Sequence, residues 1–299
     1  MENNLIEECL KECTLCPHNC KVNRLEGKIG RCRAGKDIKL GHVQVHGFEE
    51  PCISGENGSG TVFFSGCNLS CVFCQNYKIS QNDSGKLISV EELADEFIKL
   101  QEKNVNNINL VTGFMYVPHI VEAVKIAKEK GLVIPIVYNS SGYESIETLK
   151  LLEGTVDIYL PDFKYFYNEL GEEYSKVKNY FEVVKNALVE MRRQVPENIF
   201  DENGIMKKGM IIRHLVLPNY IRNSKRVLKY IKENFDHDIL ISIMAQYFPT
   251  NKANEYKNIN RKLNEEEYND ILEYLEILGI ENGFIQDLED DEEKYVPKF

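Results

Sequence analysis

Three features that would define other classes of protein are missing from this sequence. Its 299 residues contain no apolar run that approaches the roughly 20 residues of a membrane-spanning helix. Basic residues are not in excess, because 36 lysines and arginines stand against 47 aspartates and glutamates. The net charge of -11 argues against a nucleic-acid binder and against a binder of anionic membranes. The first residues, MENNLIEECLKE, lack a basic segment and an apolar core, so we expect no secretory signal and a cytoplasmic location.

Cysteine is absent from the last three quarters of the chain. All nine cysteines lie between Cys9 and Cys74. Cysteines used as small buried apolar residues would be scattered along the chain, and an odd number without an export signal argues against a disulfide framework. Their clustering therefore predicts thiolate ligands for metal in a reducing compartment.

The rest of the composition, 43% hydrophobic and 28% charged, is typical of a globular protein. We predict three segments. Residues 1–55 form a Cys-rich, turn-rich, metal-binding segment that contains one strand, Ile38–His46. Residues 56–286 alternate short apolar runs with amphipathic helices, and residues 287–299 form an acidic tail.

The alternating segment predicts an α/β fold. Two helix starts carry capping boxes, Ser89 with Glu92 and Asn264 with Glu267, and Gly279 ends the last helix. Strands that alternate with helices form parallel sheets, and six units are too few to close an eight-unit barrel. We therefore expect an open partial barrel with its function at the carboxyl ends of the strands. The six predicted strands are Thr61–Ser65, Ile108–Val111, Val133–Tyr138, Val156–Leu160, Ile211–Leu217 and Ile239–Ala245.

Three cysteines, Cys67, Cys71 and Cys74, follow the first of these strands directly. Electron-transfer [4Fe-4S] clusters use four thiolates. Three thiolates would leave one iron open to an outside ligand, as catalytic metal sites do. The alternative is one buried helical stripe of cysteines, which does not explain their position just past a strand.

The spacing Cys67-x3-Cys71-x2-Cys74, with Phe73 before the last cysteine, resembles the signature of radical S-adenosylmethionine (SAM) enzymes. The resemblance implies a partial (β/α)6 barrel and a [4Fe-4S] cluster whose open iron is chelated by SAM. It also implies reductive cleavage of SAM to a 5′-deoxyadenosyl radical, which abstracts a substrate hydrogen. Such an oxidoreductase requires an electron donor such as flavodoxin or ferredoxin.

Residues further along narrow the resemblance to glycyl-radical-enzyme activating enzymes. Asp162-Phe-Lys164 is similar to their Asp-x-Lys motif, and Arg213 matches the arginine that meets the SAM carboxylate. Asn139 and Ser141 match their ribose-side contacts. From residue 13 to residue 286 the chain resembles the branch related to pyruvate formate-lyase activating enzyme, which implies a protein or peptide substrate.

Two departures separate the chain from that family. The Gly-Gly-Glu motif that receives the SAM amine is replaced by Thr112-Gly113-Phe114, where Thr112 and backbone carbonyls are the available acceptors. Gln246 stands where activating enzymes often have a histidine, and its amide can bond a ribose or an adenine edge.

The remaining cysteines leave alternatives open. Cys13, Cys16, Cys20 and Cys32 make four ligands, enough for a tetrahedral zinc or for a second [4Fe-4S] cluster. Cys52 belongs to neither set. Its expected place is a flexible loop over the barrel mouth, as a cluster ligand, as a catalytic hydrogen-atom donor or as an inert thiol.

Simpler explanations also exist for the polar residues and for the function. Asp162 with Lys164 could be a surface ion pair, and Arg213 could pair with an acidic neighbour. Instead of acting on a protein, the enzyme could modify a small molecule or transfer a methyl group. A non-enzyme alternative is an iron–sulfur or zinc protein for electron transfer or sensing.

Overall fold

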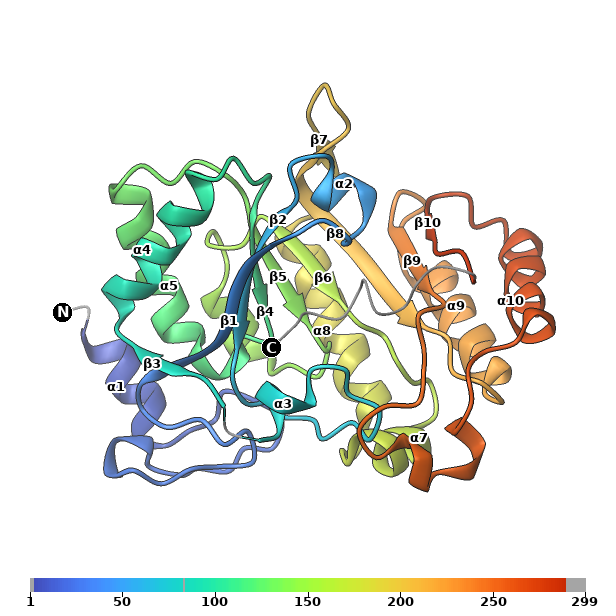
Figure 1. The fold of residues 1–299 in the computed structure, drawn as a ribbon, viewed down its shortest axis with the longest axis horizontal. Coiled ribbons are helices and arrows are strands. Elements are labelled where there is room, and N and C mark those ends of the chain that lie inside the picture. The colour runs from blue at the N-terminus through green and yellow to red at the C-terminus, as the bar shows by residue number, and fades with distance from the viewer. Residues whose placement is uncertain (1–2, 83, 289–299) are drawn as a thin grey trace.

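The computed structural model describes residues 3–82 and 84–288. A mixed sheet organises this part of the chain, with the strand order β10-β9-β8-β6-β5-β4-β2-β1-β3 and β7 paired to β8 (Figure 1). The strands are β1 (Ile38–His46), β2 (Ser59–Phe64), β3 (Lys86–Ile88), β4 (Ile108–Val111), β5 (Ile136–Ser140), β6 (Ile158–Pro161), β7 (Ile199–Phe200), β8 (Met206–Leu215), β9 (Leu240–Met244) and β10 (Gly283–Ile285).

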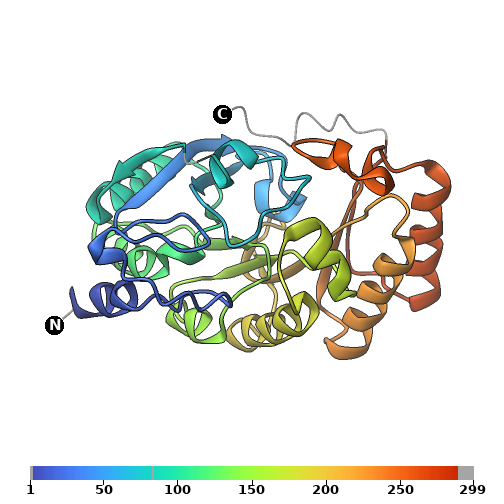
Figure 2. The ribbon, with the colours of Figure 1, turned by 90° about the horizontal axis from the view of Figure 1, so that it is seen from below.

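The helices are α1 (Asn3–Lys11), α2 (Pro51–Ser54), α3 (Tyr77–Ser80), α4 (Val90–Gln101), α5 (Val117–Glu129), α6 (Ile146–Leu151), α7 (Asn168–Leu170), α8 (Tyr180–Gln194), α9 (Ile221–Asn234) and α10 (Glu265–Leu278). Helices α2 and α3 lie toward opposite ends of the strands, and the longer helices follow the outside of the curved sheet (Figure 2). Their inward stripes bury apolar side chains such as Leu93 and Phe97 of α4 against the sheet. No helix in the described part of the chain is both long and apolar enough to cross a membrane.

The predicted α/β partial barrel is confirmed. Strands β2, β4, β5, β6, β8 and β9 run parallel to their neighbours in this order, while β1 pairs antiparallel with β2 and β7 pairs antiparallel with β8. Both capping boxes form, and Gly279 ends α10 with a left-handed φ of 61°. The sequence did not predict the short strands β3, β7 and β10. Strand β10 pairs parallel to β9 and adds a seventh parallel strand.

The N-terminal segment packs against the barrel. Strand β1 extends the sheet beyond β2, and Arg24 is fully buried with its guanidinium donating to the Gly35 and Met115 carbonyls. Thr148 of α6 donates to the Leu15 carbonyl at 3.0 Å. The proposed division at residue 55 stays a prediction. The acidic tail lies outside the described residues from residue 289 onward.

Candidate active site

A cavity of about 840 Å³ opens at the carboxyl ends of the parallel strands. Its lining includes the cysteine triplet that follows β2 and polar residues that end or follow β4, β5, β6, β8 and β9. The sequence-predicted residues that it brings together are Cys67, Cys71, Phe73, Cys74, Thr112, Asn139, Ser141, Asp162, Lys164, Arg213 and Gln246. Thus the topology gathers at one edge residues that are far apart in the chain, as expected for a parallel barrel.

Each thiol of the triplet has a polar neighbour. The Ser175 hydroxyl forms a hydrogen bond with Cys71 Sγ at 3.0 Å, and the Ser80 hydroxyl forms one with Cys74 Sγ at 3.3 Å. Burial raises the pKa of all three thiols, that of Cys71 to about 11, while the Lys164 ammonium lowers it. These thiols are therefore protonated at neutral pH, and binding a metal cluster would release their protons.

The arrangement fits a cluster better than a single ion. The three thiols influence one another's charge, so they share one end of the cavity. Yet among residues 3–82 and 84–288 no three His, Cys, Asp or Glu side chains have the spacing of ligands to one metal ion. A four-iron cube binds each thiolate through a different iron, so its ligands stand farther apart than those of one ion.

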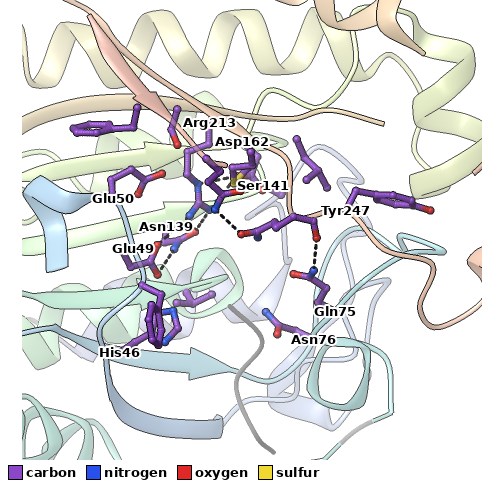
Figure 3. A pocket seen from close by; sticks show the side chains of 18 of the residues that line it. His46, Glu49, Glu50, Gln75, Asn76, Asn139, Ser141, Asp162, Arg213 and Tyr247 are labelled. Atoms are coloured by element: carbon purple, nitrogen blue, oxygen red, sulfur yellow. Dashed lines mark hydrogen bonds and ion pairs between the residues drawn. The ribbon is translucent and has the colours of Figure 1, made fainter. Parts of the chain in front are cut away.

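Arg213 connects three elements at the centre of the cavity (Figure 3). Its Nε donates to Asp162 Oδ1 at 3.0 Å, its Nη2 to Asn139 Oδ1 at 2.6 Å and its Nη1 to Glu49 Oε2 at 3.2 Å. Burial alone would lower the pKa of Arg213, but Asp162 and the neighbouring glutamates raise it. Arg213 therefore keeps its charge in a largely buried place.

Asp162 and Lys164 form a buried ion pair, with only 15% and 14% of their side chains exposed. Burial opposes the ionisation of Asp162, but Arg213 and Lys164 hold its pKa below the usual value. The surface-pair alternative is therefore wrong. The suggestion that Arg213 pairs with acidic neighbours is correct for this structure, where its partners face the cavity.

The end of β4 carries backbone strain. Thr112 adopts a left-handed φ of 58°, which is unusual for a β-branched residue and is typical of functional sites. Gly113 lies behind it, where a β-carbon would come within 2.7 Å of Ile120. The side of this turn that faces the cavity is therefore Thr112 and its backbone.

Sequence reasoning missed the roles of Glu49 and Glu50, which also line the cavity. Glu49 accepts hydrogen bonds from Asn109 Nδ2 at 3.1 Å and from Arg213. Both glutamates precede β2 in the chain, and no motif spacing connects them to the strand ends. Their place depends on how the segment between β1 and β2 folds.

The expected place of Cys52 is wrong. Pro51 begins the short helix α2, and Cys52 on that helix is packed among Ile53, Val137 and Ile158 in a buried apolar cluster. Burial raises the pKa of its thiol to about 12. The apolar side chains of β5 and β6 offer a better environment for this thiol than an exposed loop would.

The N-terminal cysteines lie together outside the cavity lining. Cys13, Cys16 and Cys32 are buried. Burial is the main cause that raises the pKa of Cys16 and Cys32, and the charges of neighbouring cysteines raise it further. The segment touches the triplet loop, because His18 Nε2 donates to the Asn68 carbonyl at 2.8 Å. A β-carbon on Gly66 would lie 2.3 Å from the Cys32 carbonyl oxygen.

The chain is similar to one family model and to two proteins of known sequence. The model of the Radical SAM superfamily matches residues 61–202. An uncharacterized protein of Methanocaldococcus jannaschii is 38% identical over 281 residues, which cover 91% of this chain and 76% of that protein. A proposed glycyl-radical enzyme activating enzyme of Haemophilus influenzae is 22% identical over 199 residues, 65% of this chain and 72% of that one.

Solved structures support the fold. The FeFe-hydrogenase maturase HydG from Carboxydothermus hydrogenoformans superposes with a TM-score of 0.53 at 16% identity, and the match covers 77% of this chain and 53% of HydG. A spore photoproduct lyase variant reaches a TM-score of 0.50 at 12% identity, over 75% of this chain and 74% of that one. With its cysteine triplet at the end of the first barrel strand, the chain belongs to the radical SAM superfamily, whose enzymes use a [4Fe-4S] cluster and SAM.

Proposed function

We propose that this enzyme cleaves SAM reductively and abstracts a hydrogen atom from a protein or peptide, as a glycyl-radical-enzyme activase does. The observation that carries the proposal is a single cavity lined by the cysteine triplet and by the Asp162, Lys164 and Arg213 group. The similarity to the Haemophilus influenzae protein supports the choice of a peptide target.

Cys67, Cys71 and Cys74 would hold the cluster. When bound, the cluster supplies the electron that breaks the C5′–S bond of SAM and so generates the hydrogen-abstracting radical. The hydroxyls of Ser175 and Ser80, already bonded to two of the thiols, would keep the ligands oriented.

SAM would lie across the strand ends beside this triplet. The guanidinium of Arg213 is suited to the carboxylate of SAM, and Asp162 and the carbonyl of strained Thr112 are suited to its ammonium. Asn139, Ser141 and Gln246 would contact the ribose and the adenine. Phe73, packed edge-on against Tyr247 with ring centroids 5.7 Å apart, is the apolar wall that limits water.

We also propose that the N-terminal quartet, Cys13, Cys16, Cys20 and Cys32, binds a second iron–sulfur cluster. A tetrahedral zinc requires four sulfurs at about 2.3 Å from one point. Four thiolates satisfy either group, and the use of a [4Fe-4S] cluster by radical SAM enzymes favours a second cluster here. The turn-rich segment would gain folding free energy from such a group.

Anaerobically reconstituted protein, reduced with dithionite, should convert SAM to 5′-deoxyadenosine and methionine. Replacing Cys67, Cys71 and Cys74 together with alanine should abolish this conversion, because no thiolate is left to hold the cluster. Cys52→Ala is the matched control, since this buried cysteine lies outside the cavity lining and should cleave SAM at the wild-type rate. Undiminished cleavage by the triple variant would contradict the proposal.

A further inference from the structure

We propose that the end of the cavity opposite the cysteine triplet binds an organic cation of the substrate, a primary ammonium or a guanidinium group, through Glu50 with Glu49. The inference rests on the proposed function, because it assigns a substrate class to the same cavity. Four observations carry it: the position of the two glutamates, a buried oxygen without a partner, an excess of acidic over basic side chains, and aromatic rings that line the same cavity.

Glu50 directly precedes α2, at the end of the barrel where the strands start, and Glu49 reaches from there to Arg213. The segment from β1 to β2 carries α2 to the amino ends of the strands. There Asn106 and Asn107, just before β4, donate to the Ser54 and Ile53 carbonyls of α2. In Figure 1, α2 and α3 lie toward opposite ends of the strands, and α3 follows the cysteine triplet. The residues from this segment that line the cavity include His46, Phe48, Glu49 and Glu50. A substrate bound here would lie on the side of the SAM site that is nearer the amino ends of the strands.

One carboxyl oxygen of Glu50 lacks a hydrogen-bond partner among the described residues, which a ligand could supply. It is only 8% exposed, and its Oε2 has no hydrogen-bond partner in the described structure. Burial raises the pKa of Glu50, while Arg213 and a hydrogen bond from Ser242 lower it, and Figure 3 shows the carboxyl group turned toward Arg213. An unpartnered buried carboxylate oxygen costs free energy that a cationic donor would recover.

The acidic side chains in the cavity outnumber the basic ones. Three buried acidic side chains, Glu49, Glu50 and Asp162, face Lys164 and Arg213, which are the lysine and arginine side chains among the described residues lining the cavity. Burial raises the pKa of both glutamates and Arg213 lowers it, so a bound cation would favour their charged form. Burial lowers the pKa of His46, so this imidazole does not supply the missing charge. A [4Fe-4S]2+ core with three thiolates is singly negative and SAM is singly positive, so together they leave the excess unchanged.

Aromatic rings complete the subsite. Phe48, which precedes Glu49 in the chain, and Phe284, which pairs with Ser242 between β10 and β9, also line the cavity. Ring faces attract ammonium and guanidinium groups, and guanidinium can also bond two carboxylate oxygens at once. A carboxylate beside aromatic rings therefore favours an organic cation over a hydrated metal ion.

Calorimetry on cluster-loaded, SAM-bound protein tests this with four ligands. They are butylguanidinium, N-acetylarginine methylamide, N-acetyllysine methylamide and the neutral citrulline counterpart of the arginine amide. We expect the cations to bind and the citrulline amide to bind at least tenfold more weakly. Tighter binding of the amides than of butylguanidinium would identify a peptide as the source of the cation.

Glu50→Gln and Glu50→Asp should each weaken cation binding at least tenfold and leave SAM affinity unchanged. Glu56→Gln is the matched control, because Glu56 is exposed just after α2. Equal binding of cations to wild type and both Glu50 variants, no discrimination against citrulline, or loss of SAM affinity in place of cation affinity would overturn the inference. SAM cleavage is measured in the same preparations. Absent cleavage contradicts the proposed function, whereas cleavage without cation binding contradicts this inference alone.

Discussion

Arg213 donates to acceptors on three elements, so its planar fork matters as much as its charge. Arg213→Lys keeps the charge but loses this fork. We expect the variant to retain its iron and to bind SAM about ten- to a hundredfold more weakly, equivalent to roughly 1.5–3 kcal/mol. Equilibrium dialysis with labelled SAM and iron analysis would measure both.

Arg261→Lys is the control for that substitution. Arg261 bonds both oxygens of Glu267 at 2.7 and 2.8 Å, but it lies outside the cavity lining. SAM affinity should therefore be unchanged in this variant. If Arg213→Lys lost its iron along with SAM affinity, Arg213 would be holding the fold and our assignment would be incorrect.

Glu144 is a buried carboxyl behind β5 whose protonation links stability to pH. Burial raises its pKa to about 8, against hydrogen bonding from Ser140, and its Oε2 has no partner in the described structure. Because the folded-state pKa exceeds the unfolded one, the stability from the protonated group is complete below about pH 4.5. It is lost as the pH rises through 8.

Glu144→Gln removes that titration. The stability of the variant relative to wild type should therefore be about 2–3 kcal/mol more favourable at pH 9 than at pH 6. Urea unfolding of both proteins, prepared alike at the two pH values, measures the difference. A difference independent of pH would show that Glu144 is ionised in the folded protein across this range.

The loop that follows β2 and carries the cysteine triplet packs against the N-terminal cysteine segment. Gly66 has a φ of 96°, and a β-carbon there would collide with the backbone oxygen of Cys32. Gly27 has a comparable φ of 78° but open space around it. The two glycines thus share the conformational strain of substitution but not the collision.

Gly27→Ala should lower the melting temperature by about 2–4 °C, the effect of roughly 1 kcal/mol of strain in a protein of this size. Gly66→Ala should lower it at least twice as far and reduce bound iron, since the backbone of Cys32 cannot move aside as a side chain can. Differential scanning calorimetry and iron analysis measure these effects. Equal shifts for the two variants would mean that the contact between the segments is not important.

The protein would carry two iron–sulfur clusters if both proposed sites are filled. Anaerobically loaded protein should then contain about eight irons, and replacing Cys13, Cys16, Cys20 and Cys32 with alanine should leave about four. Mössbauer spectroscopy distinguishes the two clusters. Stoichiometric zinc in the wild type, with about four irons, would contradict the second cluster.

Local patterns in the sequence predicted much of the architecture. Short apolar runs identified the six parallel strands β2, β4, β5, β6, β8 and β9. The side chains of Ser89 and Asn264 marked two helix starts, because such patterns and caps involve residues that are neighbours in the chain. The cysteine triplet was placed correctly at the end of β2 for the same reason. Once the strands are parallel, their carboxyl ends must meet, and so Asn139 and Arg213 come together.

Long-range packing decided the rest. Strand β10 is too short to show a period, and it exists because its backbone pairs with β9. Cys52 lies in a buried helix and not in the predicted loop, because apolar side chains of β5 and β6, distant in the chain, surround it. Glu49 and Glu50 reach the cavity because asparagines before β4 hold α2 at the amino ends of the strands. These contacts join residues separated by tens of positions, and their free energy exists only after the sheet has formed.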